Sequence, residues 1–110
     1  MEINAATTAL GALAQDNRLT LFRHLVRLGP DGSRVSEIRD VLAIPNATLS
    51  FHLATLKHAG LIKCERRGRE LIYSANFEAM RSLLHYLTDD CCNGHPEICG
   101  DLMNSKSQCC

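Results

Sequence analysis

The chain has 110 residues, 45% of them hydrophobic, and 12 Lys and Arg residues balance 12 Asp and Glu residues. This length suits one domain with a modest core, and the composition excludes a low-complexity disordered chain. No apolar run approaches the ~18 residues of a membrane-spanning helix, and no basic residue precedes the apolar N-terminus as one would in a signal peptide. We therefore expect a cytoplasmic protein without a membrane partner.

The charge is unevenly distributed along the chain. Residues 1–81 hold 11 Lys and Arg against 8 Asp and Glu, whereas residues 82–110 hold one lysine against four acids. The basic part could face a polyanion and the acidic part a cation. On charge alone, two ordinary solvated surfaces remain the simpler interpretation.

Two helices are predicted first. Residues Asn4–Ala14 form a small-residue helix whose larger apolar side chains are Ile3, Leu10 and Leu13. Asp16 or Asn17 can cap the next helix, Arg18–Leu28, which ends at Gly29-Pro30-Asp31-Gly32. One face of that helix gathers three leucines, namely Leu21, Leu25 and Leu28.

A helix-turn-helix is predicted next. Ser36 can cap a short helix in which Ile38, Val41 and Leu42 recur at helical spacing. Pro45-Asn46 breaks that helix and starts another, which ends with Gly60 just beyond its C-cap. Two short helices joined by a tight break are typical of this motif.

A basic hairpin and a final helix complete the predicted fold. Strand-like runs at 61–66 and 70–74 flank Arg67-Gly68-Arg69, and Phe77–Asp90 is helical. The last helix carries one apolar stripe, formed by Phe77, Met80, Leu84 and Leu87. The order indicates a mainly α fold with a small β-hairpin, a winged helix-turn-helix. We expect residues 1–90 to form this domain and residues 91–110 to be a cysteine-rich segment and tail.

The second helix of the motif has a candidate DNA surface. At about 100° per residue, Leu49, Leu53 and Leu56 face the core, so Phe51 points away from it. Apolar contact with thymine methyl groups would explain such a phenylalanine. His52 lies at the edge of the core face, where internal packing and DNA contact are equally good interpretations. Hydroxyls for phosphates or base edges come from Thr48, Ser50 and Thr55.

The hairpin tip carries Arg66, Arg67 and Arg69 around Gly68. Such a cluster is usually a solvated loop. Next to a helix-turn-helix it is better interpreted as a wing that contacts backbone phosphates.

The segment TLSFHLATLKHAGLI, followed by the arginine-rich hairpin, resembles the helix-turn-helix and wing of the ArsR/SmtB family of metal-responsive bacterial repressors. The shared pattern is S-x-H-L-x-x-L-x-x-A-G-L, matched by Ser50, His52, Leu53, Leu56, Ala59, Gly60 and Leu61. The resemblance implies a homodimer, paired through its first and last helices, that represses an operon on double-stranded operator DNA until an inducer binds. No catalytic constellation stands out in the sequence, so we expect no enzymatic activity and no required cofactor.

Both common sensing sites of that family are absent from the sequence. The first helix of the motif reads SEIRDVLA, without the cysteine cluster of the best-known arsenic site, and the last helix offers only His85 for a zinc-type site. The remaining candidate for an inducer site is CCNGHPEIC, residues 91–99.

Several kinds of cysteine site are possible there. Neighbouring Cα atoms, about 3.8 Å apart, are too close for an ordinary Cys91–Cys92 disulfide. Nearby acids favour neutral thiols and so disfavour a redox sensor or a nucleophile. Zinc could take Cys91, Cys92, Cys99 and His95, although the spacing is not that of a zinc finger. Three thiolates around a trivalent, three-coordinate ion form a neutral unit, which suits As(III) or Sb(III).

Within the family, some arsenic repressors resemble this chain in carrying a vicinal Cys-Cys after the last helix and a third cysteine downstream. This resemblance assigns the inducer site, for As(III) or Sb(III), to Cys91, Cys92 and Cys99. A zinc- or thiol-redox-responsive repressor and a winged-helix protein-interaction module remain alternatives. Cys64 is expected to be a small buried hydrophobe, and Cys109-Cys110 an auxiliary thiol pair or simply a chain end.

Overall fold

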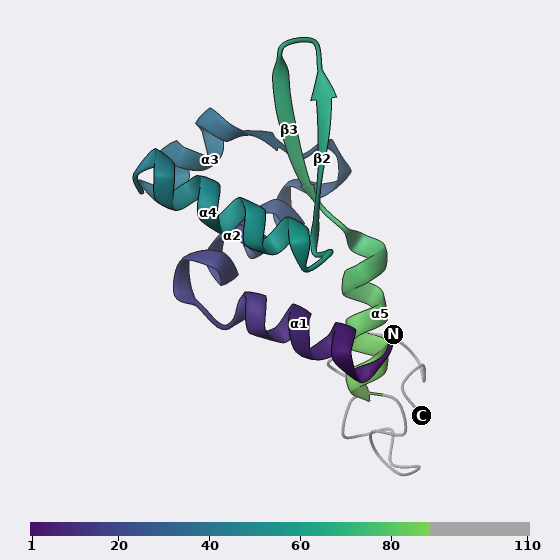
Figure 1. Cartoon of the computed structure of the whole chain (residues 1–110). Coiled ribbons are helices and arrows are strands. Elements are labelled where there is room, and N and C mark those ends of the chain that lie inside the picture. The colour runs from purple at the N-terminus through teal and green to yellow at the C-terminus, as the bar shows by residue number, and fades with distance from the viewer. Residues whose placement is uncertain (89–110) are drawn as a thin grey trace.

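Residues 1–88 are described by the structure, a computed structural model. Their elements follow the predicted order, with one strand added (Figure 1). The helices are α1 (Ile3–Leu13), α2 (Asp16–Leu28), α3 (Val35–Leu42), α4 (Asn46–His58) and α5 (Phe77–Thr88), with a 3-10 turn η1 at Gly29–Asp31. The strands are β1 (Ser33–Arg34), β2 (Ile62–Arg67) and β3 (Glu70–Ala75). The prediction of a mainly helical winged helix-turn-helix is confirmed. None of the helices in these 88 residues is long and apolar enough to cross a membrane.

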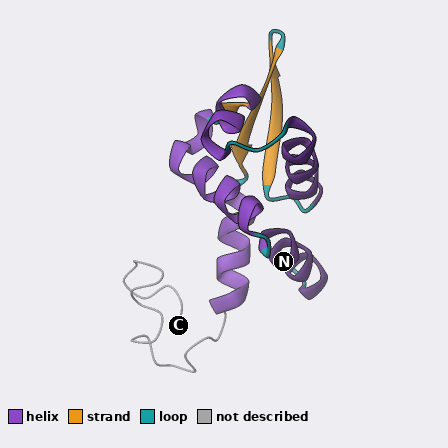
Figure 2. Ribbon diagram, turned by 90° about the vertical axis from the view of Figure 1, so that its left-hand side faces the viewer, coloured by secondary structure: helices purple, strands orange, loops and turns teal. Residues whose placement is uncertain are grey.

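The hairpin of β2 and β3, hereafter the wing, projects from the helical body, while α1 and α5 contact each other at the opposite end (Figures 1 and 2). Its strands pair in antiparallel register from Ile62↔Ala75 to Arg67↔Glu70, which leaves Gly68 and Arg69 as a two-residue turn. Gly68 has a φ of 66°, a value that glycine adopts without strain.

The unpredicted strand β1 makes the sheet three-stranded, in the order β1-β3-β2. Ser33 pairs with Tyr73, and Arg34 pairs with Ile72. Gly32 precedes β1 with a φ of 70°, and a Cβ there would collide with the backbone carbonyl of Tyr73. A glycine is therefore required where the chain enters the sheet.

The core takes its side chains from the apolar faces of the helices, although some apolar residues that recur at helical spacing are exposed. Leu49, Leu53 and Leu56 of α4 are buried as expected. Leu28 is 43% exposed. The buried face of α2 includes Phe22 as well as Leu21 and Leu25, so the centre of this face lies on the side of the helix away from Leu28. Val41 is 56% exposed, since the partly buried side chains of α3 lie on the other side of Ile38. Recurrence at helical spacing therefore does not bury Leu28 or Val41.

Two of the predicted helix caps are also wrong. The side chain of Gln15, and not Asp16 or Asn17, caps α2 by accepting a hydrogen bond from the Arg18 N–H at 2.9 Å. At the start of α3, Glu37 Oε1 accepts from the Arg34 N–H at 3.1 Å, so Ser36 is not the cap. In both cases a longer polar side chain supplies the acceptor that the N-terminal N–H groups need.

The predicted stop of α4 is confirmed. Gly60 has a φ of 81°, its N–H donates to Lys57 O at 2.9 Å, and the Leu61 N–H donates to Leu56 O at 3.0 Å. This pair of bonds is the Schellman motif.

Asn76 joins the end of α4 to the start of α5. Its N–H donates to Leu61 O at 2.8 Å, and its Nδ2 donates to Gly60 O at 3.0 Å. Its Oδ1 accepts from the Ala79 N–H at 3.2 Å, which caps α5. One side chain thus fixes the two helices relative to each other.

Candidate nucleic-acid interface

Helix α4, the predicted recognition helix, has one buried face and one open face. Phe51 is 62% exposed, and Ala47, Ser50 and Ala54 are exposed beside it. Phe51 also lines a shallow hollow between α1 and α4. The division into faces is as predicted; contact of the open face with DNA stays a prediction.

The three predicted hydroxyl groups of α4 differ in their surroundings. Ser50 is exposed, whereas Thr48 is half-buried. Thr55 Oγ1 donates to Phe51 O of its own helix at 2.9 Å, so its proton is already engaged. Ser50 is therefore the hydroxyl best placed to contact a partner.

His52 lies on the core side of α4, with 5% of its surface exposed. Its Nδ1 is 3.4 Å from Arg18 Nη1, and burial, followed by the nearby Arg18 charge, lowers the pKa of the imidazole. The proximity makes the neutral ring, accepting at Nδ1, the favoured form. The burial favours the internal-packing interpretation of His52, and its contact with DNA stays a prediction.

The wing presents Arg66, Arg67 and Arg69 on its exposed surface. Arg67 Nε donates to Glu65 Oε1 at 2.9 Å, which lowers the pKa of the glutamate and raises that of the arginine. Within residues 1–88, Arg66 and Arg69 form no ion pair. These two are therefore more available than Arg67 for phosphate.

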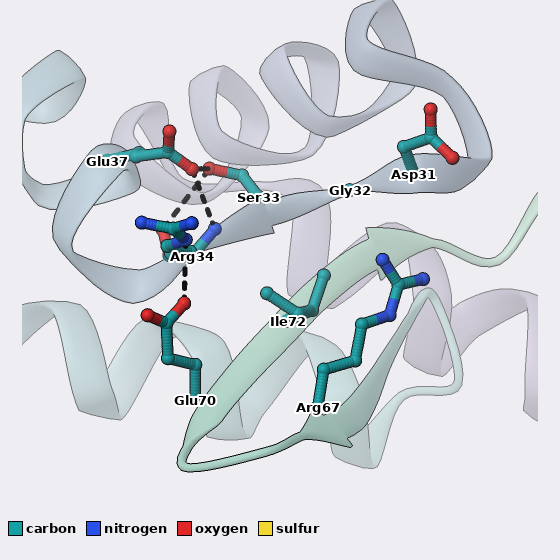
Figure 3. Close-up of a pocket in the computed structure, with 8 residues that line it drawn as sticks. All are labelled: Asp31, Gly32, Ser33, Arg34, Glu37, Arg67, Glu70 and Ile72. Carbon is teal, nitrogen blue, oxygen red and sulfur yellow. Dashed lines mark hydrogen bonds and ion pairs between the residues drawn. The ribbon is translucent and has the colours of Figure 1, made fainter.

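A cavity of about 460 Å³ lies where the wing meets β1 and the start of α3 (Figure 3). Arg34 Nε and Glu70 Oε2 form an ion pair across it at 2.6 Å, and Ser33 Oγ donates to Glu37 Oε1 at 3.3 Å. Carboxylates and guanidinium groups both line the cavity, so it lacks the uniformly positive charge that an anion site needs. The Arg34–Glu70 pair braces β3 of the wing against β1, directly before α3. The sequence gives no local sign of this brace, because its partners lie far apart along the chain.

The predicted inducer cysteines, Cys91, Cys92 and Cys99, lie outside the described residues, as do His95, Cys109, Cys110 and the predicted boundary at residue 90. Cys64 is half-buried and pairs across the strands with Tyr73. Burial, together with the Cys64 thiol, raises the pKa of the Tyr73 hydroxyl. In the part of the chain that the structure describes, no three His, Cys, Asp or Glu side chains gather as a metal site.

Comparisons with known proteins agree with this architecture. Residues 13–65, from the end of α1 into β2, match a helix-turn-helix domain family. The chain is 32% identical to the Bacillus subtilis protein YbzH, described as an uncharacterized HTH-type transcriptional regulator; the match covers 69% of this chain and 88% of YbzH. It is 37% identical over 71 residues to the HTH-type transcriptional repressor SmtB of Mycobacterium tuberculosis.

The chain belongs to the ArsR/SmtB family of winged helix-turn-helix transcriptional regulators. Its fold also matches an ArsR-like transcriptional regulator from Rhodococcus sp. RHA1, with a TM-score of 0.72, 18% identity and 96% coverage of both chains. The match to SmtB covers 64% of this chain and only half of SmtB. These ArsR/SmtB relatives are regulators of transcription and not enzymes.

Proposed function

We propose that the chain is a homodimeric repressor that binds operator DNA and releases it when As(III) or Sb(III) binds the thiolates of Cys91, Cys92 and Cys99. The observation that carries the DNA-binding part is the open face of α4, where Phe51 is 62% exposed beside Ser50, next to a wing with exposed arginines. A helix of this kind fits the major groove, and wing arginines neutralise phosphates.

Exposed apolar side chains on α1 and α5 support the homodimer. Ile3 and Leu10 of α1 are 65% and 43% exposed, and Leu87 of α5 is 50% exposed. Helices α1 and α5 contact each other, so these side chains belong to one end of the molecule. Exposed apolar groups gathered in this way are typical of an interface. A second copy of the chain is the partner that the family resemblance implies.

The donor set supports the choice of inducer. Three thiolates neutralise a trivalent, three-coordinate ion, whereas zinc needs a fourth ligand, which His95 would have to supply. Residues 93–98 include Asn93-Gly94 and Pro96, and closing so short a loop carries a small entropic penalty.

The route from the thiols to the DNA surface runs through α5. The cysteines follow α5 in the sequence, and Asn76 joins the start of α5 to the end of α4 at Gly60 and Leu61. Closing the loop between Cys92 and Cys99 changes the end of α5 and, through the dimer, the spacing of the two α4 helices. A coupling of ~1–3 kcal/mol, typical of allostery, would weaken operator binding about 5–150-fold.

Binding of the promoter DNA upstream of the chain's own gene tests the proposal. We expect a mobility shift that arsenite reverses, and loss of that reversal in Cys91→Ser, Cys92→Ser and Cys99→Ser. Cys64→Ser is the matched control and should respond as the wild type does. Release by zinc or by peroxide, without a response to arsenite, would support the alternative sensors. Absence of any shift would favour a protein-interaction module anchored by Phe51.

The dimer is tested separately by Leu87→Glu, which places a charge on the exposed apolar face of α5. Sedimentation should show a shift toward monomer. Leu71→Glu, which alters a leucine of the wing that is 42% exposed, is the control and should leave the dimer intact.

A further inference from the structure

Asn46, the first residue of α4, is exposed, and its side chain accepts a hydrogen bond from the neighbouring helix α3. Arg39 of α3 donates from Nη1 to Asn46 Oδ1 at 2.9 Å. The bond crosses the turn of the helix-turn-helix, in which Ala43 adopts a left-handed conformation with a φ of 54° and donates to Arg39 O at 2.7 Å. Arg39 therefore binds the turn through its backbone and the start of α4 through its side chain.

The chemistry of the pair fixes the orientation of the amide. The oxygen and nitrogen of an asparagine side chain are normally hard to distinguish, but a guanidinium group can only donate hydrogen bonds. The atom that faces Arg39 must therefore be Oδ1. The amide nitrogen Nδ2, with its two hydrogens, is left on the other side of the group.

This orientation changes what Asn46 can recognise. An asparagine that reads adenine uses Oδ1 and Nδ2 together, one to accept and one to donate. Here Oδ1 is turned toward α3, and the amino group is the part left for a partner. Asn46 and Ser50 are four residues apart on α4, so both exposed side chains lie on the same side of the helix.

We propose that Asn46 contacts the operator as a hydrogen-bond donor to an acceptor on a base edge in the major groove, and that Arg39 is the positioning residue for its amide. This inference rests on the proposed function. The N-terminal residues of a recognition helix are those that reach base edges, and the groove offers purine N7, guanine O6 and thymine O4 as acceptors. A phosphate oxygen is a second source of the same acceptor chemistry, and the experiment distinguishes the two.

The first test compares Asn46→Ala and Asn46→Asp with the wild-type chain in binding the promoter duplex. Loss of one hydrogen bond should weaken binding about 2- to 12-fold in Asn46→Ala. Asn46→Asp should bind more weakly still, because a carboxylate has no donor and repels an acceptor. Wild-type affinity in either variant would overturn the inference. Thermal unfolding checks that both variants fold.

The role of Arg39 is tested by a double-mutant cycle. Asn46→Ala should lose less affinity in an Arg39→Ala background than in the wild type, since the amide is no longer held there. Additive losses would overturn the positioning role. Arg27→Ala removes the same charge from the exposed surface of α2, and it controls for the general electrostatic effect on DNA.

The acceptor is located by altering the duplex one position at a time. A base-pair change that weakens the wild type but not Asn46→Ala identifies a base edge and supports the inference. If weaker binding by the wild type but not by Asn46→Ala appears only when one phosphate of the duplex is replaced by a neutral methylphosphonate, the partner is a phosphate. The base-edge assignment is then overturned. If the wild-type chain binds no duplex, the proposed function itself is contradicted. If the chain binds the duplex but its affinity does not change on substitution of Asn46, only this inference is contradicted.

Discussion

Arg18 links His52 of the recognition helix to the end of α1. Its Nη1 lies 3.4 Å from His52 Nδ1, and its Nε donates to Ala12 O at 2.6 Å. Helices α1 and α4 therefore share one guanidinium group. Helix α1 carries part of the proposed dimer face, and α4 carries the proposed DNA face. Changes at the dimer face have a direct polar connection to α4, in addition to the connection through Asn76.

This relationship predicts a pH dependence of stability. Burial and Arg18 lower the pKa of His52 below its ordinary value of 6.5 in the folded chain. The unfolded chain therefore binds a proton first as the pH falls, so the free energy of unfolding should decrease from about pH 6.5 down to the folded pKa. Urea unfolding at pH 7.5, 6.5 and 5.5, at constant protein concentration, measures this change. His52→Gln should reduce the pH dependence in that range; an unchanged dependence would contradict the assignment to His52.

The wing arginines should contribute unequally to DNA binding. Arg66→Ala and Arg69→Ala should each weaken binding to any duplex and reduce the slope of log K against log salt by about 0.9. Arg67→Ala should have a smaller effect, because Glu65 already pairs with that side chain. Fluorescence anisotropy titrations at several salt concentrations give the slopes.

Glu65→Gln provides the converse measurement. Removing the carboxylate frees Arg67 for phosphate, so this variant should bind DNA more tightly than the wild type. If all three arginine variants retain wild-type affinity at physiological salt, the wing does not contact DNA.

Phe51→Ala should weaken DNA binding with little change in stability, since the ring is 62% exposed. The predicted partner of the ring is a thymine methyl group. Replacing single thymines of the duplex by uracil removes only that methyl, so one such replacement should weaken the wild type but not Phe51→Ala. If no replacement of thymine by uracil changes the affinity of the wild-type chain, Phe51 has another role.

Gly32→Ala should destabilise the chain more than Gly29→Ala. Both glycines have positive φ values, 70° and 80°, which alanine adopts at a penalty on the order of 1 kcal/mol or more. Only at Gly32 does a Cβ also collide with Tyr73 O, whereas the space around Gly29 is open. Chemical unfolding of the two variants isolates the steric contribution. Equal losses would mean that β1 can move away from β3.

The sequence predicted those features that depend on neighbouring residues. Leu49, Leu53 and Leu56 recur at helical spacing, and a glycine ends α4, so the recognition helix and its open face follow from local rules. Strand β1 could not be predicted, because two residues show no periodicity and pair only with a strand that follows much later.

Contacts between distant residues decided the remaining features of the candidate site. His52 could not be assigned to the core until Arg18, 34 residues earlier in the chain, was placed beside it. The Arg34–Glu70 brace and the Arg39–Asn46 bond likewise join different elements. Side-chain hydrogen bonds of this kind leave no pattern in hydrophobicity or turn propensity.

The hydrogen bonds of Asn76 have a mechanical consequence. They fix one end of α5 beside the last turn of α4, so the 12-residue helix is a lever whose fulcrum adjoins the recognition helix. At about 1.5 Å per residue the lever is ~18 Å long, and a tilt of ~10° at the fulcrum displaces the Thr88 end by ~3 Å. Displacement of the Thr88 end of α5 would therefore be accompanied by a small rotation of the helix beside Gly60.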